Sequence, residues 1–72
     1  MNNQFRLLDV VALTEDISED GLYHGQVGTI VEILAPNVYE VEFSNGEGET
    51  YAMRSLRAGQ LMALHYRLLD AA

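Results

Sequence analysis

The sequence predicts an all-β domain in which five short strands form a small barrel. Three observations lead to this prediction. Five short runs of branched and aromatic residues are separated by turn residues. A long polar segment follows the first run, and an Asn-Gly hairpin signal joins the third run to the fourth. The segment before the last run is too short for a full helix and predicts only a short turn.

The first half of the chain contains two predicted strands and a long loop. Residues 7–13 (LLDVVAL) are rich in apolar and branched side chains and predict the first strand. Residues 14–25 hold four acids and two glycines without alternation, so we expect an excursion loop there. Residues 26–34 (QVGTIVEIL) predict the second strand. Because glycine weakens a strand, Gly28 marks either a bulge or a close backbone approach.

The second half of the chain alternates strands with short turns. Pro36 and Asn37 predict the first turn, because proline fixes φ and asparagine tolerates positive φ. In order, the predicted elements are a turn at 35–37, a strand at 38–43, a hairpin loop at 44–48, a strand at 49–54, a 3₁₀ turn within 55–60 and a strand at 61–66.

Alternation of side chains also predicts how the third and fourth strands pair. Opposed residues of an antiparallel pair point to the same face. We therefore expect Val41 to lie opposite Tyr51 in the core. By the same register Tyr39 lies opposite Met53, and residues 45–47 form a three-residue loop. The outer face of the hairpin is then expected to carry Glu40, Glu42, Thr50, Ala52 and Arg54.

These elements, in this order, describe an SH3-like barrel. The five-stranded OB-fold is the main alternative, but it normally has a helix between strands three and four, where this chain has only five residues. Closing the sheet into a barrel leaves few exposed edges. We expect one domain over residues 1–72, with residues 1–6 and 67–72 frayed.

Charge is the most informative bulk property of the 72 residues. Eleven Asp and Glu stand against four Arg, lysine is absent, and the net charge is −7. Nucleic-acid binding draws much of its affinity from Lys and Arg, so the composition argues against direct DNA or RNA binding. An acidic surface suits a basic protein partner, although acidic charge also simply keeps a small protein soluble.

Composition also bears on where the protein resides. The sequence has no cysteine, which excludes disulfides and thiolate metal sites. It has no run of about 20 apolar residues and no signal-peptide core after Met1. We therefore expect a cytoplasmic protein without a membrane partner.

Two resemblances add to this interpretation. Residues 25–33 (GQVGTIVEI) resemble the G-x-x-G-x-V-x-x-I core of KOW-type SH3-like domains of transcription elongation factors and ribosomal proteins. That resemblance implies an alternative function, an accessory domain of the ribosome or of the transcription machinery. Its pattern is short and marks the second strand of the barrel more than any activity.

The longer resemblance covers about sixty residues. Four phrases, at residues 7–22, 25–43, 50–53 and 60–66, resemble in their order a family of small uncharacterised bacterial proteins, common in cyanobacteria and catalogued as a domain of unknown function. The resemblance implies an SH3-like, cytosolic protein. Members of such a family are often encoded beside another small protein that also occurs in toxin-like contexts. This neighbourhood implies an antitoxin or immunity-like role. The chain departs from the relatives at Tyr23-His24, where a more basic pair is expected, and in lacking lysine.

The titratable residues do not form a pattern typical of catalysis or metal binding. A barrel of this size fills its interior with side chains, and the acids fall mostly in a loop and on an outer face. We expect no enzyme activity and no cofactor. His24 and His65 lack the usual ligand spacing and are expected to be ordinary surface histidines, and residues 15–20 do not match an EF-hand loop.

The best candidate for function is a surface that binds a protein. We expect the acids of the long loop to steer a basic partner, with Leu22 and Tyr23 as apolar anchors. A hydrophobic latch that closes the barrel is an equally good explanation of these two residues. Three alternatives stay open: a proline-rich peptide bound at Tyr23 and Tyr66, pairing at a strand edge, and a homodimer. The full candidate set is Glu15, Asp16, Glu19, Asp20, Leu22, Tyr23, Glu40 and Glu42.

Overall fold

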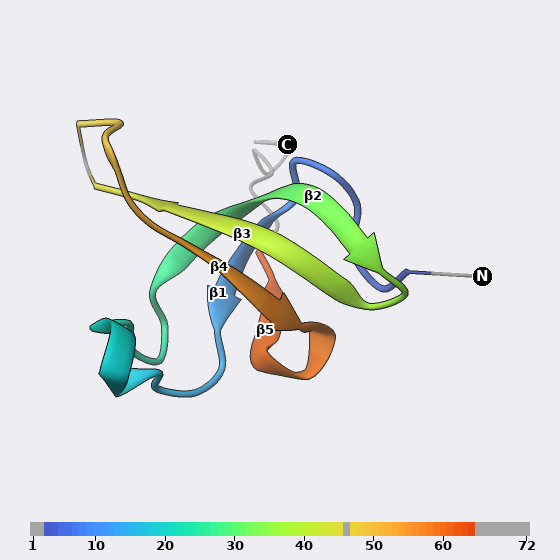
Figure 1. The fold of residues 1–72 in the computed structure, drawn as a ribbon, viewed down its shortest axis with the longest axis horizontal. Helices are drawn as coiled ribbons and strands as arrows, with labels where there is room; N and C mark the ends of the chain where they lie inside the picture. The colour runs from blue at the N-terminus through green and yellow to red at the C-terminus, as the bar shows by residue number, and fades with distance from the viewer. Residues whose placement is uncertain (1–2, 46, 65–72) are drawn as a thin grey trace, which may run out of the picture.

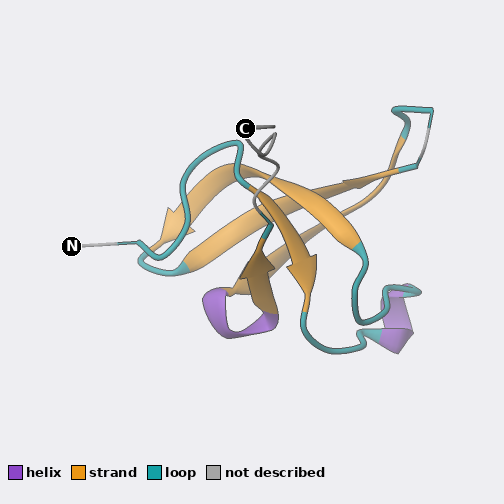
Figure 2. Ribbon diagram, turned by 180° about the vertical axis from the view of Figure 1, so that it is seen from behind, coloured by secondary structure: helices purple, strands orange, loops and turns teal. Residues whose placement is uncertain are grey.

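The computed structural model describes residues 3–45 and 47–64, which form one antiparallel sheet of five strands (Figure 1). The strand order across the sheet is β4-β3-β2-β1-β5. Two 3₁₀ turns, η1 and η2, interrupt the strands (Figure 2). Among the described residues no helix is long and apolar enough to cross a membrane. The elements are β1 (Val10–Leu13), η1 (Ser18–Asp20), β2 (Val27–Ala35), β3 (Val38–Ser44), β4 (Thr50–Arg57), η2 (Ala58–Gln60) and β5 (Leu61–Ala63).

The sheet is curved but not closed. The start of β2 pairs with β1, and most of its length pairs with β3, so β2 belongs to both halves of the sheet. β4 and β5 form the two edges. The predicted all-β fold, with its five strands, long first loop and 3₁₀ turn before the last strand, is confirmed. The expected closed cylinder is not observed, because no ladder joins β4 to β5 within residues 3–45 and 47–64.

The largest differences from the predicted element boundaries are at the start of β1 and the end of β4. β1 begins at Val10 rather than at residue 7, because residues 6–9 form a turn in which Leu8 has a φ of 72°. The Asp9 carboxylate stabilises this turn by accepting the Arg6 N–H at 3.0 Å. β4 continues to Arg57, so the 3₁₀ turn is confined to the last three residues of its predicted range. The end of the predicted fifth strand, at 65–66, lies outside the described residues.

The predicted register of the β3–β4 hairpin is wrong. Val41 lies opposite Arg54, not opposite Tyr51. Tyr39 lies opposite Leu56, not opposite Met53. The core side of β4 is therefore made by the residues that the prediction placed outside.

A longer loop and a bulge together explain this difference. The predicted three-residue loop at 45–47 is wrong, because the five residues 45–49 separate the paired Ser44 and Thr50. Ser44 pairs with Thr50 across a loop of odd length, but Phe43 pairs with Ala52, so Tyr51 is an extra residue on β4. One extra residue exchanges the faces of all the residues that follow it. Glu40 and Glu42 lie on the outer face as predicted. Thr50 shares this face, because its hydroxyl donates a hydrogen bond to Glu42. The outer-face assignments of Ala52 and Arg54 are wrong, and Met53 and Ser55 take their places.

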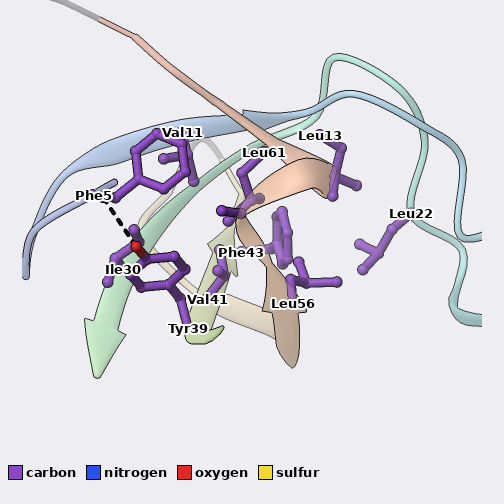
Figure 3. Packing of buried hydrophobic residues seen from close by; sticks show 11 residues of the cluster. Phe5, Val11, Leu13, Leu22, Ile30, Tyr39, Val41, Phe43, Leu56 and Leu61 are labelled. Carbon is purple, nitrogen blue, oxygen red and sulfur yellow. Dashed lines mark hydrogen bonds between the residues drawn. The ribbon is translucent and has the colours of Figure 1, made fainter. Parts of the chain in front are cut away.

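Side chains from all five strands fill the concave side of the sheet (Figure 3). Gly28 leaves room for two core side chains of β3: a Cβ atom there would lie 2.7 Å from Cγ1 of Val41 and 2.9 Å from the ring of Phe43. Of the two explanations predicted for Gly28, the bulge is wrong, because the irregular pairing of β2 falls later in the strand, and the close contact is made by side chains packed on the Gly28 backbone. The buried strand residues include Val11, Leu13, Ile30, Tyr39, Val41, Phe43, Leu56 and Leu61.

Residues 3–6 pack against the sheet, which corrects the expectation that they are frayed. Phe5 is 3% exposed, and its ring meets that of Tyr39 edge to face at 5.5 Å. The Tyr39 hydroxyl accepts the Phe5 N–H at 3.0 Å and donates to Oδ1 of Asn37 at 3.1 Å. The same Oδ1 accepts the Gln4 N–H, while the Asn37 N–H donates to Oδ1 of Asn3. The predicted fraying of 67–72 concerns residues outside those described.

Candidate partner-binding surface

The long loop between β1 and β2 is a folded unit. Backbone hydrogen bonds between Leu13 and residues 25–26 close its base. At its tip Ile17 and Leu22 exchange backbone hydrogen bonds of 2.7 and 3.2 Å, with η1 between them. Gly21 permits the return because its φ is 72°, a value that side chains disfavour. This geometry turns Leu22 inward, where it is fully buried at one end of the core (Figure 3).

An ion pair ties the tip of the loop to the edge of the sheet. Nε of Arg54 lies 2.7 Å from Oδ2 of Asp20, and its second guanidinium nitrogen donates to Oδ1 at 3.0 Å. Such two-pronged pairs fix orientation as well as distance. The hydrogen bond from Arg54 holds the pKa of Asp20 below its usual value. A third nitrogen of Arg54 donates to the Met53 carbonyl, so this guanidinium also occupies part of the β4 edge.

A second link joins the loop to β4 through one amide side chain. Oε1 of Gln26 accepts the Tyr23 N–H at 2.9 Å, and Nε2 of Gln26 donates to the hydroxyl of Tyr51. Tyr23 is 53% exposed and Tyr51 is 48% exposed. We call Tyr23, Gln26 and Tyr51 the tyrosine surface. The Tyr51 ring is held at its hydroxyl and the Tyr23 main chain at its N–H, while about half of each tyrosine faces water.

Of the acids in the loop, Asp16 adjoins this surface. Oδ1 of Asp16 accepts the N–H of His24 at 2.8 Å, next to Tyr23. Oε2 of Glu15 accepts a hydrogen bond from Gln60 of η2 at 3.1 Å, and Glu19 is exposed on η1. No group of three or more His, Cys, Asp or Glu in the described part of the chain is arranged to hold a metal ion.

A model of the family described as "Domain of unknown function (DUF4926)" matches residues 7–63. The chain belongs to this family. The resemblance to a domain of unknown function is therefore confirmed. No curated protein and no solved structure matches the chain. The DUF4926 match includes all five strands and the tyrosine surface, whereas Phe5 lies before its first residue.

The DUF4926 fold separates the predicted binding residues into two sets. Glu15, Asp16, Glu19, Asp20 and Tyr23 share the long loop. Leu22 is in the core, as the latch interpretation expects, and offers no exposed area. Glu40 and Glu42 alternate with the fully buried Tyr39, Val41 and Phe43 along β3, so they lie on the opposite face of the sheet.

Tyr51 is the residue that sequence reasoning missed. It was placed in the core because alternation was continued through the hairpin without a bulge. The sequence signals a longer loop only indirectly, through Asn45 and Gly48. In the structure Gly48 takes a φ of 85°, and Oδ1 of Asn45 accepts the N–H groups of Glu47 and Glu49. No comparable signal marks the bulge itself. Tyr66 and His65, which were also considered, lie outside the described residues.

Proposed function

We propose that this DUF4926 domain is a non-catalytic module that binds a basic protein through the tyrosine surface. The observation that carries the proposal is the pair of half-exposed tyrosines, Tyr23 and Tyr51, held on either side of Gln26. Tyrosine is among the residues in which the binding energy of interfaces concentrates. A large ring with few rotatable bonds gives contact area at a small entropic cost.

The hydrogen bonds of Gln26 strengthen this argument. The Tyr51 ring, which is held at its hydroxyl, loses little freedom when a partner arrives, and preorganisation of this kind raises affinity. Gln26 orients the Tyr23 backbone and the Tyr51 hydroxyl together. The exposed faces of the rings remain available for apolar contacts.

Charge supplies the second part of the proposal. The domain carries a net charge of −7, and Asp16 and Glu19 lie in the loop that bears Tyr23. Complementary charge speeds encounter and rejects wrong partners. Lys or Arg side chains of the partner can also stack on the tyrosine faces, an attraction of about 0.5–2 kcal/mol. A role as the neutralising or accessory member of a two-protein bacterial system in the cytoplasm is compatible with such a surface.

The test begins with purified full-length protein as bait in a lysate of the source organism. Any enriched protein is then purified, and its Kd is measured directly. We expect a protein of high isoelectric point whose affinity falls at least tenfold with Tyr23→Ala or Tyr51→Ala. Leu34→Ala is the matched control, because Leu34 is equally exposed but lies at the far end of β2. Affinity that survives both tyrosine changes would falsify the proposal.

The KOW-like alternative is tested by titrating bulk RNA at several salt concentrations. A domain that binds RNA through phosphates loses affinity steeply as salt rises. We expect no saturable RNA binding at 150 mM salt, since eleven acids repel the backbone. Saturable binding with a steep salt slope would favour an RNA-associated function instead.

A further inference from the structure

The outer face of the sheet carries a second organised surface. Its residues form three rows that cross the strands, as the pairing of the strands shows. The first row joins β5, β1 and β2, the second joins β1 to β4, and the third joins β2 to β4. The rows are Met62–Ala12–Val27, Val10–Thr29–Glu42–Met53 and Glu32–Glu40–Ser55.

One corner of this face is apolar. Ala12 lies between its cross-strand neighbours Val27 and Met62 and is 6% exposed. Val27 and Met62 themselves are more than 40% exposed. Val10 extends the corner along β1. Three adjacent strands span about 10 Å, so this is a continuous patch and not an isolated exposed residue.

The neighbouring corner is acidic. Glu32 of β2 lies directly opposite Glu40 of β3, and Glu42 lies two residues further along β3 on the same face. Like charges directly opposite each other destabilise a sheet. A partner that brings cations to this corner removes that repulsion and gains binding energy from it.

We propose that this face is a docking site for a basic amphipathic helix of another protein. A helix is about 10 Å wide, which matches the apolar corner across β5, β1 and β2. Its apolar stripe covers Ala12, Val27 and Met62, and Lys or Arg on one flank meets Glu40 and Glu42. Charge argues against a second copy as the occupant, because each copy carries −7 and the same acidic corner.

This proposal is independent of the tyrosine surface, which lies at the long loop. The test uses the full chain against a displayed library of helical peptides with a fixed apolar stripe and randomised flanks. We expect enriched peptides to carry Lys or Arg on one flank. Their amide chemical-shift changes on the protein should centre on Val10, Ala12, Val27, Glu42 and Met62.

Variants decide between the surfaces. Val27→Glu is expected to weaken an enriched peptide at least tenfold, and Met62→Ala severalfold, with thermal midpoints recorded to show that both fold. Leu34→Glu is the matched control, an exposed leucine of β2 outside the three rows. Glu40→Gln with Glu42→Gln should reduce the salt dependence of binding.

Four results overturn the proposal: no enrichment, enriched peptides without basic flanks, shifts confined to Tyr23 and Tyr51, or unchanged affinity of Val27→Glu. A concentration-dependent dimer that Val27→Glu dissociates would assign the face to a second copy.

Discussion

The two ends of the core are closed by segments that differ in chemistry (Figure 3). At one end the long loop inserts Leu22, and at the other the N-terminal arm inserts Phe5. The loop is held to β4 by the charged pair of Asp20 and Arg54. The arm is held to β3 and to the turn before it by neutral hydrogen bonds that converge on Tyr39 and Asn37.

This comparison shows how an open sheet of five strands obtains a closed core. Strand pairing leaves the two ends of the core uncovered, and the buried Leu22 and Phe5 cover them (Figure 3). The loop does so with one buried residue and leaves its acids and Tyr23 outside. The buried and the exposed residues are thus separated within a loop of thirteen residues, 14–26, whereas the arm serves packing.

The largest expected effect is that of Phe5→Ala. The substitution removes a ring that is 3% exposed and packed edge to face on Tyr39, and buried Phe→Ala changes cost about 3–5 kcal/mol. Urea unfolding measures the loss. Leu8→Ala is the control, since that side chain is 73% exposed and should change stability by less than about 0.5 kcal/mol. A loss of under about 1 kcal/mol for Phe5→Ala would show that the arm is not part of the core.

Leu22→Ala should destabilise the opposite end by about 2–5 kcal/mol, since Leu22 is fully buried. Chemical unfolding again provides the value. Tyr23→Ala, the adjacent but exposed residue, is the control and should cost far less. Equal losses for the two variants would contradict the division of the loop into a buried and an exposed side.

Asn37→Ala tests the neutral bonds of the arm. The change removes the acceptor of Gln4 N–H and Tyr39 O–H, and it places alanine at a φ of 59°, for a combined cost of about 1–3 kcal/mol. Asn37→Gly separates the two causes, because glycine tolerates the backbone angle but makes no side-chain bond. If glycine restores full stability, the side-chain bonds contribute nothing.

The smallest effect, and one that depends on pH, is expected at the charged pair. The pKa of Asp20 is lowered by its hydrogen bond from Arg54, so the pair's stabilisation is present above the unfolded pKa of about 4. It is lost as pH falls through the lower folded pKa. NMR titration of the Asp20 carboxyl should show this low pKa, and Arg54→Gln should raise it. An Asp20 pKa that does not respond to Arg54→Gln contradicts the link.

Much of the fold could be predicted because each strand is a compact run bounded by turn residues. The special role of Gly28 could also be predicted locally, because a glycine within a strand run is itself a signal. The arm was missed because Phe5 is a single aromatic residue among polar neighbours, and its burial depends on Tyr39, 34 residues away. The face assignments of β4 were missed because the bulge at Tyr51 depends on how two strands meet rather than on their separate sequences.

The candidate site was predicted in part for related reasons. The acids and Tyr23 were found because they share one segment of sequence. Their separation from Glu40 and Glu42 required the face of each strand to be known. Tyr51 could enter the site only after the register was corrected.

The most direct test is an NOE measurement of the β3–β4 pairing, because the tyrosine surface requires Tyr51 to lie outside the core. The account predicts cross-strand contacts from Val41 to Arg54 and from Phe43 to Ala52, together with contacts from the Gln26 side-chain amide to the Tyr51 ring. Cross-strand contacts between Val41 and Tyr51 would bury Tyr51 in the core and contradict it.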